Sequence, residues 1–163
     1  MEIERKWLVS GFPQEGIAKI NSKVKLEQIY ISTEPEIRLR KRRPDGDYPR
    51  GIPYRICMKS EGTLSREEFQ SEIDSAFYDD VAEYLDKDPI RKYCINYDDG
   101  KGHEVSIARV DGSWFYAEVE FDSEAEALDY KFPWPEIVVK EVTKDKAYKM
   151  KNYWKRTRLG VKD

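Results

Sequence analysis

Charged residues recur at every second position in three short stretches, and their types could bind metal ions and phosphates. They are Glu2, Glu4 and Lys6 at the start, Arg38, Arg40 and Arg42 in the segment 36–42, and Glu118 with Glu120 in the segment 114–121. Side chains two residues apart on a β-strand point to the same face. Carboxylate oxygens suit Mg²⁺ or Mn²⁺, and the planar guanidinium of arginine suits phosphate oxygens. A ligand that needs both groups at once is a metal-bound polyphosphate.

The sorting of charge by sign distinguishes these faces from an ordinary solvated one. An antiparallel sheet can have one wet face, and that interpretation stays open for any single strand. However, like charges at neighbouring positions repel, so a solvated face usually mixes its signs. A sheet of about eight strands closed into a barrel explains the sorting, because its interior has room for side chains and one small ligand. The chain has no G-x-x-x-x-G-K-[ST] motif, so the predicted phosphate site is not a P-loop.

Length and composition indicate one compact, charge-rich domain over residues 1–163. The 29 basic and 32 acidic side chains give a net charge of −3, which disfavours a nucleic-acid partner because such binders are more often net basic. Cys57, Cys94 and the lone His103 make no zinc constellation. No apolar run approaches the ~18 residues that span a bilayer, and no basic leader is recognisable. We therefore expect a cytoplasmic protein with free thiols and no membrane partner.

Period-2 alternation predicts a mainly antiparallel architecture of the α+β class. The predicted strands cover residues 1–9, 26–32, 36–42, 54–60, 65–73, 91–97, 103–110 and 114–121. Helices are expected over 75–87, 123–131 and 142–159, with Ser123 and Glu126 as a capping box and Thr143 as an N-cap. We therefore expect an eight-stranded antiparallel β-tunnel, a closed barrel with its charged faces inward and its outer faces covered by helices.

Several motifs, in their order along the chain, resemble those of the CYTH domain family, the triphosphate tunnel metalloenzymes. The first is Glu2-x-Glu4-x-Lys6, which is similar to the family's ExExK signature. The others are QIYIS at 28–32, RLR at 38–40, MKSEG at 58–62, SREE at 65–68, AEVE at 117–120 and EVTKDKAYK at 141–149. The set covers nearly the whole chain and most resembles the short single-domain bacterial members.

This resemblance implies a tunnel that binds a triphosphate with one or two Mg²⁺ or Mn²⁺ ions. By analogy, the metal ligands are Glu2, Glu4, Glu118 and Glu120. The residues that hold phosphate oxygens are Arg38, Arg40, Lys59, Arg66 and Lys92. The expected catalytic residues are Lys6, which holds phosphates or positions the attacking water, and Glu68, which binds metal or organises the basic groups.

The chain departs from the family's pattern at four positions. They are Gln70, Cys94, Ser106 and Ala147, which stand where relatives often have Glu, Arg, Asp and Arg, respectively. Two basic and two acidic groups are thus missing together, which keeps the charge of the tunnel balanced. Strand parity places Arg42, Arg55 and Glu72 on the lining faces. Our hypothesis is that these three replace some of the lost charge.

Hydrolysis of a terminal phosphoryl group needs charge neutralisation and an in-line water more than a covalent nucleophile. The expected function is metal-dependent hydrolysis of a small-molecule triphosphate, either inorganic triphosphate or a nucleoside or thiamine triphosphate. One alternative is a non-catalytic triphosphate- or nucleotide-binding module, which the missing Arg and Asp at Cys94, Ser106 and Ala147 favour. Another is an adenylate cyclase, although no sequence feature identifies a base pocket. The sequence leaves open both the choice between Mg²⁺ and Mn²⁺ and whether the protein forms a homodimer.

Overall fold

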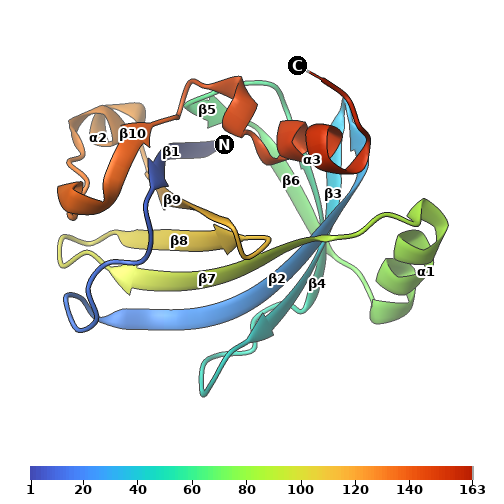
Figure 1. The fold of residues 1–163 in the computed structure, drawn as a ribbon, viewed down its shortest axis with the longest axis horizontal. Coiled ribbons are helices and arrows are strands. Elements are labelled where there is room, and N and C mark those ends of the chain that lie inside the picture. The colour runs from blue at the N-terminus through green and yellow to red at the C-terminus, as the bar shows by residue number, and fades with distance from the viewer. Residues whose placement is uncertain (163) are drawn as a thin grey trace.

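The computed structural model describes residues 1–162, which form one antiparallel sheet curled into a tunnel (Figure 1). Its strands are β1 (Glu2–Val9), β2 (Ile20–Thr33), β3 (Glu36–Pro44), β4 (Tyr54–Lys59), β5 (Ser65–Arg66), β6 (Glu68–Glu72), β7 (Ile90–Asp98), β8 (Glu104–Val110), β9 (Trp114–Glu120) and β10 (Val138–Glu141). Their spatial order is β10-β1-β9-β8-β7-β2-β3-β4-β6, and β5 pairs with β1. Only Glu67 separates β5 from β6, so this stretch bridges β1 and β4 and closes the tunnel.

The antiparallel β-tunnel is confirmed, with ten strands within residues 1–162 in place of eight. The predicted strand 65–73 is divided into β5 and β6, and β10 was not predicted. The second strand begins at Ile20, earlier than predicted, because its first part pairs with nearly the whole of β7, from Ile20 opposite Tyr97 to Gln28 opposite Ile90. The divided strand follows from a change of partner, from β1 to β4.

In the described part of the chain, three α-helices lie outside the sheet: α1 (Ser75–Leu85), α2 (Glu124–Asp129) and α3 (Met150–Arg158). In Figure 1, α2 lies near β10 and β1, α3 lies near the C-terminus, and α1 lies apart at the right. Buried side chains from the helices, including Tyr78, Ala127 and Trp154, join two apolar clusters. One cluster includes Trp7 of β1 and the other Leu39 of β3, both on outward faces. Burial of apolar surface outside, at about 25 cal/mol per Å², stabilises a wall whose inner face is charged.

The predicted helix over 142–159 is wrong in its first half. The N–H of Val142 donates to the carbonyl of Lys6 at 2.8 Å, continuing the pairing of β10 with β1. Thr143 is not an N-cap: its hydroxyl accepts from the Lys6 N–H at 3.0 Å and donates to Glu141 at 2.7 Å. These bonds hold Val142 and Thr143 against β1 as a continuation of β10, so α3 begins only after a short 3₁₀ turn (Lys146–Tyr148).

The other two predicted helices are confirmed with slightly shorter bounds. Asp74 caps α1 by accepting from the N–H of Phe77 at 2.8 Å. Ser123 caps α2 in the same way, but the carboxylate of Glu126 contacts His103 and does not complete a capping box. Within residues 1–162, no helix is long and apolar enough to cross a membrane.

Candidate active site in the tunnel

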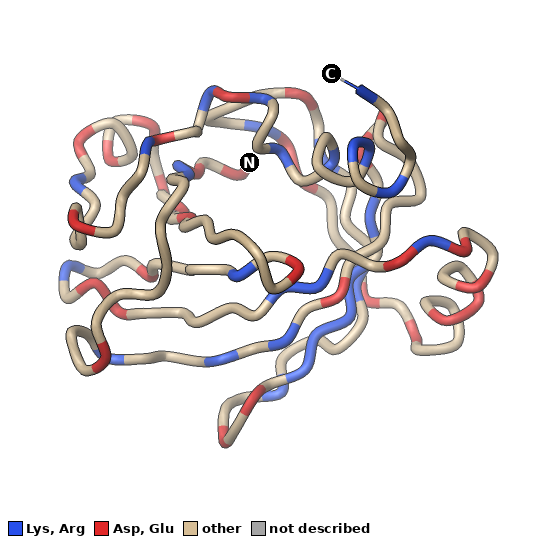
Figure 2. The backbone as a smooth tube through the Cα atoms, viewed as in Figure 1, with Lys and Arg blue, Asp and Glu red and all other residues tan. Residues whose placement is uncertain are grey.

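The inward faces of the strands enclose a cavity of about 340 Å³ whose wall is mostly charged. All the site residues predicted from the sequence line this cavity. Strand pairing brings them together from distant parts of the chain, placing Glu4 opposite Glu120, and Lys59 opposite Glu68. Figure 2 shows basic segments side by side along β2, β3 and β4, and acidic ones at the N-terminus and on α1.

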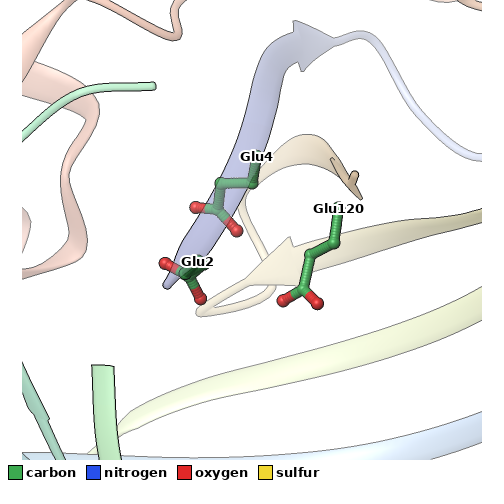
Figure 3. A group of neighbouring side chains, drawn as sticks. All are labelled: Glu2, Glu4 and Glu120. Carbon is green, nitrogen blue, oxygen red and sulfur yellow. The ribbon is translucent and has the colours of Figure 1, made fainter. Parts of the chain in front are cut away.

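Three of the four expected metal ligands form a compact carboxylate group at one end of the cavity. Oxygens of Glu2, Glu4 and Glu120 lie within 4.8 Å of one another (Figure 3). Withdrawal from bulk water raises the pKa of Glu4 well above its usual range, and the charges of Glu118 and Glu2 add to the rise. Burial and the same two neighbours raise the pKa of Glu120. Clustered carboxylates that resist ionisation fit a hard divalent cation, which prefers oxygen ligands.

The fourth expected ligand, Glu118, lies apart from this group and faces Lys6. Its carboxylate is 3.9 Å from the Lys6 ammonium. The two residues are register partners, and they lie two positions along their strands from the pair Glu4 and Glu120. Burial acts to raise the pKa of Glu118, but Lys6 and Lys92 outweigh it and hold the pKa below its usual range. Lys6 also donates to the carbonyl of Tyr148 at 2.6 Å. Glu118 is therefore an ionised partner of Lys6.

Two of the expected phosphate-binding residues are already paired with carboxylates. Lys59 lies 3.1 Å from Glu2 and 3.4 Å from Glu68. Arg66 lies 3.3 Å from Glu2 and 3.2 Å from Glu36. A metal ion bound by Glu2 would compete with both cations for its oxygens and free them for phosphate.

The other three expected phosphate-binding residues, Arg38, Arg40 and Lys92, make no ion pair within residues 1–162. The Nε of Arg38 is buried without a hydrogen-bond acceptor. Burial lowers the pKa of Lys92 to about 7, and the charge of Arg38 adds to this effect. Buried cations that lack an ion-pair partner are costly, so this part of the wall fits an anion.

Glu36 and Tyr116 are among the cavity-lining residues that the sequence reasoning missed. Glu36 is 5% exposed and binds Arg66, and it shares strand parity with Arg38. The ring of Tyr116 lies 4.1 Å from the Lys6 ammonium and 5.2 Å from that of Lys92, where it stabilises both cations. Parity with the expected ligands on the same strands was a signal that could have found both.

No family model matches the chain. A relative among known proteins is the inorganic triphosphatase of Nitrosomonas europaea, which is 34% identical over 157 residues. The match covers 92% of this chain and 94% of that protein. The chain belongs to the CYTH domain family.

Solved structures agree with this assignment. The crystal structure of the inorganic triphosphatase NE1496 is 28% identical, with a TM-score of 0.64 over 94% of this chain and 93% of that one. The PH1819 protein of Pyrococcus horikoshii OT3 is 19% identical, with a TM-score of 0.55 over 78% and 82%. A putative adenylyl cyclase from Hippeastrum, described as having a dominant triphosphatase activity, is 15% identical, with a TM-score of 0.51 over 78% and 83%. The last two show a shared fold only.

Three of the four departures of this CYTH protein from the family's pattern line the cavity, namely Gln70, Cys94 and Ser106, whereas Ala147 does not. The replacement hypothesis is wrong for two of its three residues. Arg42 and Glu72 are not part of the cavity wall, and Arg42 donates to the carbonyl of Arg50 at 2.5 Å in its own hairpin loop. Arg55 does line the cavity.

Proposed function

We propose that this CYTH protein hydrolyses a triphosphate with Mg²⁺ or Mn²⁺ held at the carboxylates of its tunnel. The observation that carries the proposal is that one cavity contains both a compact carboxylate group and buried cations without ion pairs. An anion alone would leave the negative charge of the carboxylates uncompensated. A metal ion alone would leave the positive charge of the cations uncompensated. A metal-bound triphosphate compensates both, and the name of the Nitrosomonas europaea relative supports this substrate class.

Each residue has a role that follows from its surroundings. Glu2, Glu4 and Glu120 would hold the ion, which when bound neutralises phosphate oxygens and polarises water. The cations that would bind phosphate oxygens are Arg38, Arg40 and Lys92, joined by Lys59 and Arg66 once their carboxylates turn to the metal. These groups supply positioning and charge stabilisation, which are the main needs of phosphoryl transfer.

The Lys6–Glu118 pair suits the placement of the attacking water. The ammonium of Lys6 is fixed by the carbonyl of Tyr148 and can donate to an oxygen, while the ionised Glu118 can accept a proton from water. Glu68 would act indirectly, since it holds Lys59 in place. A cysteine nucleophile is not needed, and burial raises the pKa of the Cys57 thiol, which keeps it protonated.

The experiment is a phosphate-release assay with inorganic triphosphate, ATP, GTP and thiamine triphosphate, each with Mg²⁺, Mn²⁺ or EDTA. We expect release that depends on metal and that falls by at least ~100-fold in Glu4→Gln. Glu83→Gln, an exposed carboxylate on α1, is the matched control and should retain full activity. Equal release in EDTA would contradict the metal site. If triphosphate raises the Tm but no phosphate is released, the protein is a binding module. If ATP is converted to a cyclic nucleotide, the protein is a cyclase.

A further inference from the structure

One arginine of the tunnel wall, Arg55 of β4, has no role in the site described above. It lies directly opposite Arg40 of β3 in the sheet register. Arg38 is two residues from Arg40 on the same face, and all three arginines line the cavity. Like charges opposite one another in a sheet are destabilising. Burial lowers the pKa of Arg40 to about 10, and the charges of Arg38 and Arg55 add to the effect. The three guanidinium groups therefore form a local excess of positive charge.

The hydrogen-bond partner of Arg55 is a neutral amide. Its Nη1 donates to Oε1 of Gln70 at 2.6 Å, and the amide nitrogen of Gln70 donates in turn to Glu68. A side-chain amide can accept from an arginine and donate to a carboxylate at once, and it carries no charge. Glu72 is the register partner of Arg55 on β6, but within residues 1–162 the two make no ion pair. Arg55 is thus held in position while its charge is not cancelled.

Among the cations of β3 and β4 that line the cavity, Arg40 and Arg55 lie farther from the carboxylate group than Arg38 and Lys59. Lys59 contacts Glu2, and Arg55 precedes Lys59 by four residues, about 13 Å along the strand. On β3, Glu36 is near the carboxylate group through Arg66, and Arg40 follows it by the same interval. A linear triphosphate with one end at the carboxylates would therefore extend toward the two arginines.

We propose that Arg55, positioned by Gln70, forms with Arg40 a subsite for the distal phosphate and so selects inorganic triphosphate over nucleoside triphosphates. The proposal rests on the proposed function in that the tunnel binds a triphosphate lengthwise. The terminal phosphate of inorganic triphosphate brings free, fully charged oxygens to two guanidinium groups, which bind such oxygens strongly. A nucleoside triphosphate brings an esterified phosphate and a neutral ribose to the same place.

The test compares dissociation constants for inorganic triphosphate and ATP, measured by calorimetry in EDTA. In Arg55→Gln we expect the constant for inorganic triphosphate to rise about 10- to 100-fold and that for ATP to change less than about threefold. Gln70→Glu should act in the same direction, because its carboxylate neutralises Arg55 with little change of shape. Arg42→Gln is the matched control, since this arginine of the neighbouring strand binds its own loop, and both constants should stay at the wild-type values.

Equal weakening of both ligands in Arg55→Gln, or no weakening of either, would overturn the subsite. If Arg55→Gln lowers the Tm too far for calorimetry, the same ratio of dissociation constants for inorganic triphosphate and ATP is measured in Gln70→Glu and tests the subsite. Phosphate release by the wild-type protein is read separately. A protein that shows the expected ratio of dissociation constants but releases no phosphate would refute the proposed hydrolysis and keep the subsite. One that hydrolyses triphosphate with an unchanged ratio in both variants would refute the subsite alone.

Discussion

Replacement of Lys92 by methionine is expected to stabilise the ligand-free protein at neutral pH and to reduce strongly the stability that the protein gains from triphosphate. Lys92 is 7% exposed and has no carboxylate in ion-pair contact within residues 1–162. The fall of its pKa from 10.5 to about 7 corresponds to about 5 kcal/mol, since one tenfold step in a proton equilibrium is about 1.4 kcal/mol. This is an upper limit to the free energy that Lys92⁺ removes from folding.

The direction of the pH dependence follows from proton binding in the two states. Below pH 7 Lys92 is protonated in both the folded and the unfolded protein, and the full destabilisation is present. Between pH 7 and 10.5 the unfolded chain holds the proton and the folded one releases it, so the free energy of unfolding rises with pH through this window. The wild-type profile should therefore climb relative to that of Lys92→Met, and the two should converge near pH 10.5.

The assay is urea unfolding of the ligand-free protein from pH 6 to 10, with and without inorganic triphosphate. At pH 7 we expect Lys92→Met to be more stable by about 2 to 4 kcal/mol, and triphosphate to raise its stability far less than that of the wild type. Lys151→Met is the matched control: Lys151 is 6% exposed, but its ammonium lies 2.8 Å from Glu61. Its loss should leave stability unchanged or lower it by up to about 1 kcal/mol.

Three results would refute this reasoning. If Lys92→Met is no more stable than the wild type at pH 7, with equal m-values, then Lys92⁺ is compensated in the fold and is not an uncancelled anion-binding charge. If the two profiles run parallel from pH 7 to 10, another group causes the pH dependence. A gain in stability of the same size in Lys151→Met would mean that any buried lysine is destabilising here, whether or not it has an ion-pair partner.

Two further predictions concern the carboxylate group. Glu4→Gln should raise the Tm of the metal-free protein, because it removes a carboxylate crowded by Glu2 and Glu118. Calorimetry should show that the affinity for Mn²⁺ falls at least ~10-fold. A lower Tm of the metal-free protein would instead make Glu4 a structural residue. Metal and triphosphate should bind with positive coupling, since a metal at Glu2 releases Lys59 and Arg66. Titrations in either order should show the same gain of about 5- to 100-fold, and equal affinities with and without metal would exclude this exchange of partners.

Strand parity explains why so much of the site could be predicted from the sequence. A period of two fixes which residues share a face, so Glu4 and Lys6 on one strand, or Arg38 and Arg40 on another, had to line the same wall once the sheet closed. Parity does not fix how far along the tunnel a side chain lies. Whether Glu118 or Glu120 joins Glu4 depends on the stagger between β1 and β9, which pairs Glu4 with Glu120.

The misplaced residues depend on contacts that no local pattern contains. Arg42 has the parity of a lining residue, but carbonyls of the loop between β3 and β4 bind its guanidinium. Their positions are set by the loop, in which a Cβ at Gly51 would lie 2.6 Å from the arginine. The segment after Glu141 has helical periodicity, but β1 offers it a free edge, and pairing with a distant strand overrides local preference.

The tunnel contains two kinds of cation, those paired with carboxylates and those without an ion pair. This difference explains how a charged interior can be stable and still bind an anion. Lys59 and Arg66 are paired with carboxylates, so they add little net destabilisation and become available only when a metal draws those carboxylates away. Arg40 and Lys92 have no such partners, and their destabilisation is offset by the apolar clusters outside the wall. Binding energy that relieves this repulsion is available to hold the triphosphate. Full pairing of every cation would give a more stable tunnel with a weaker anion site.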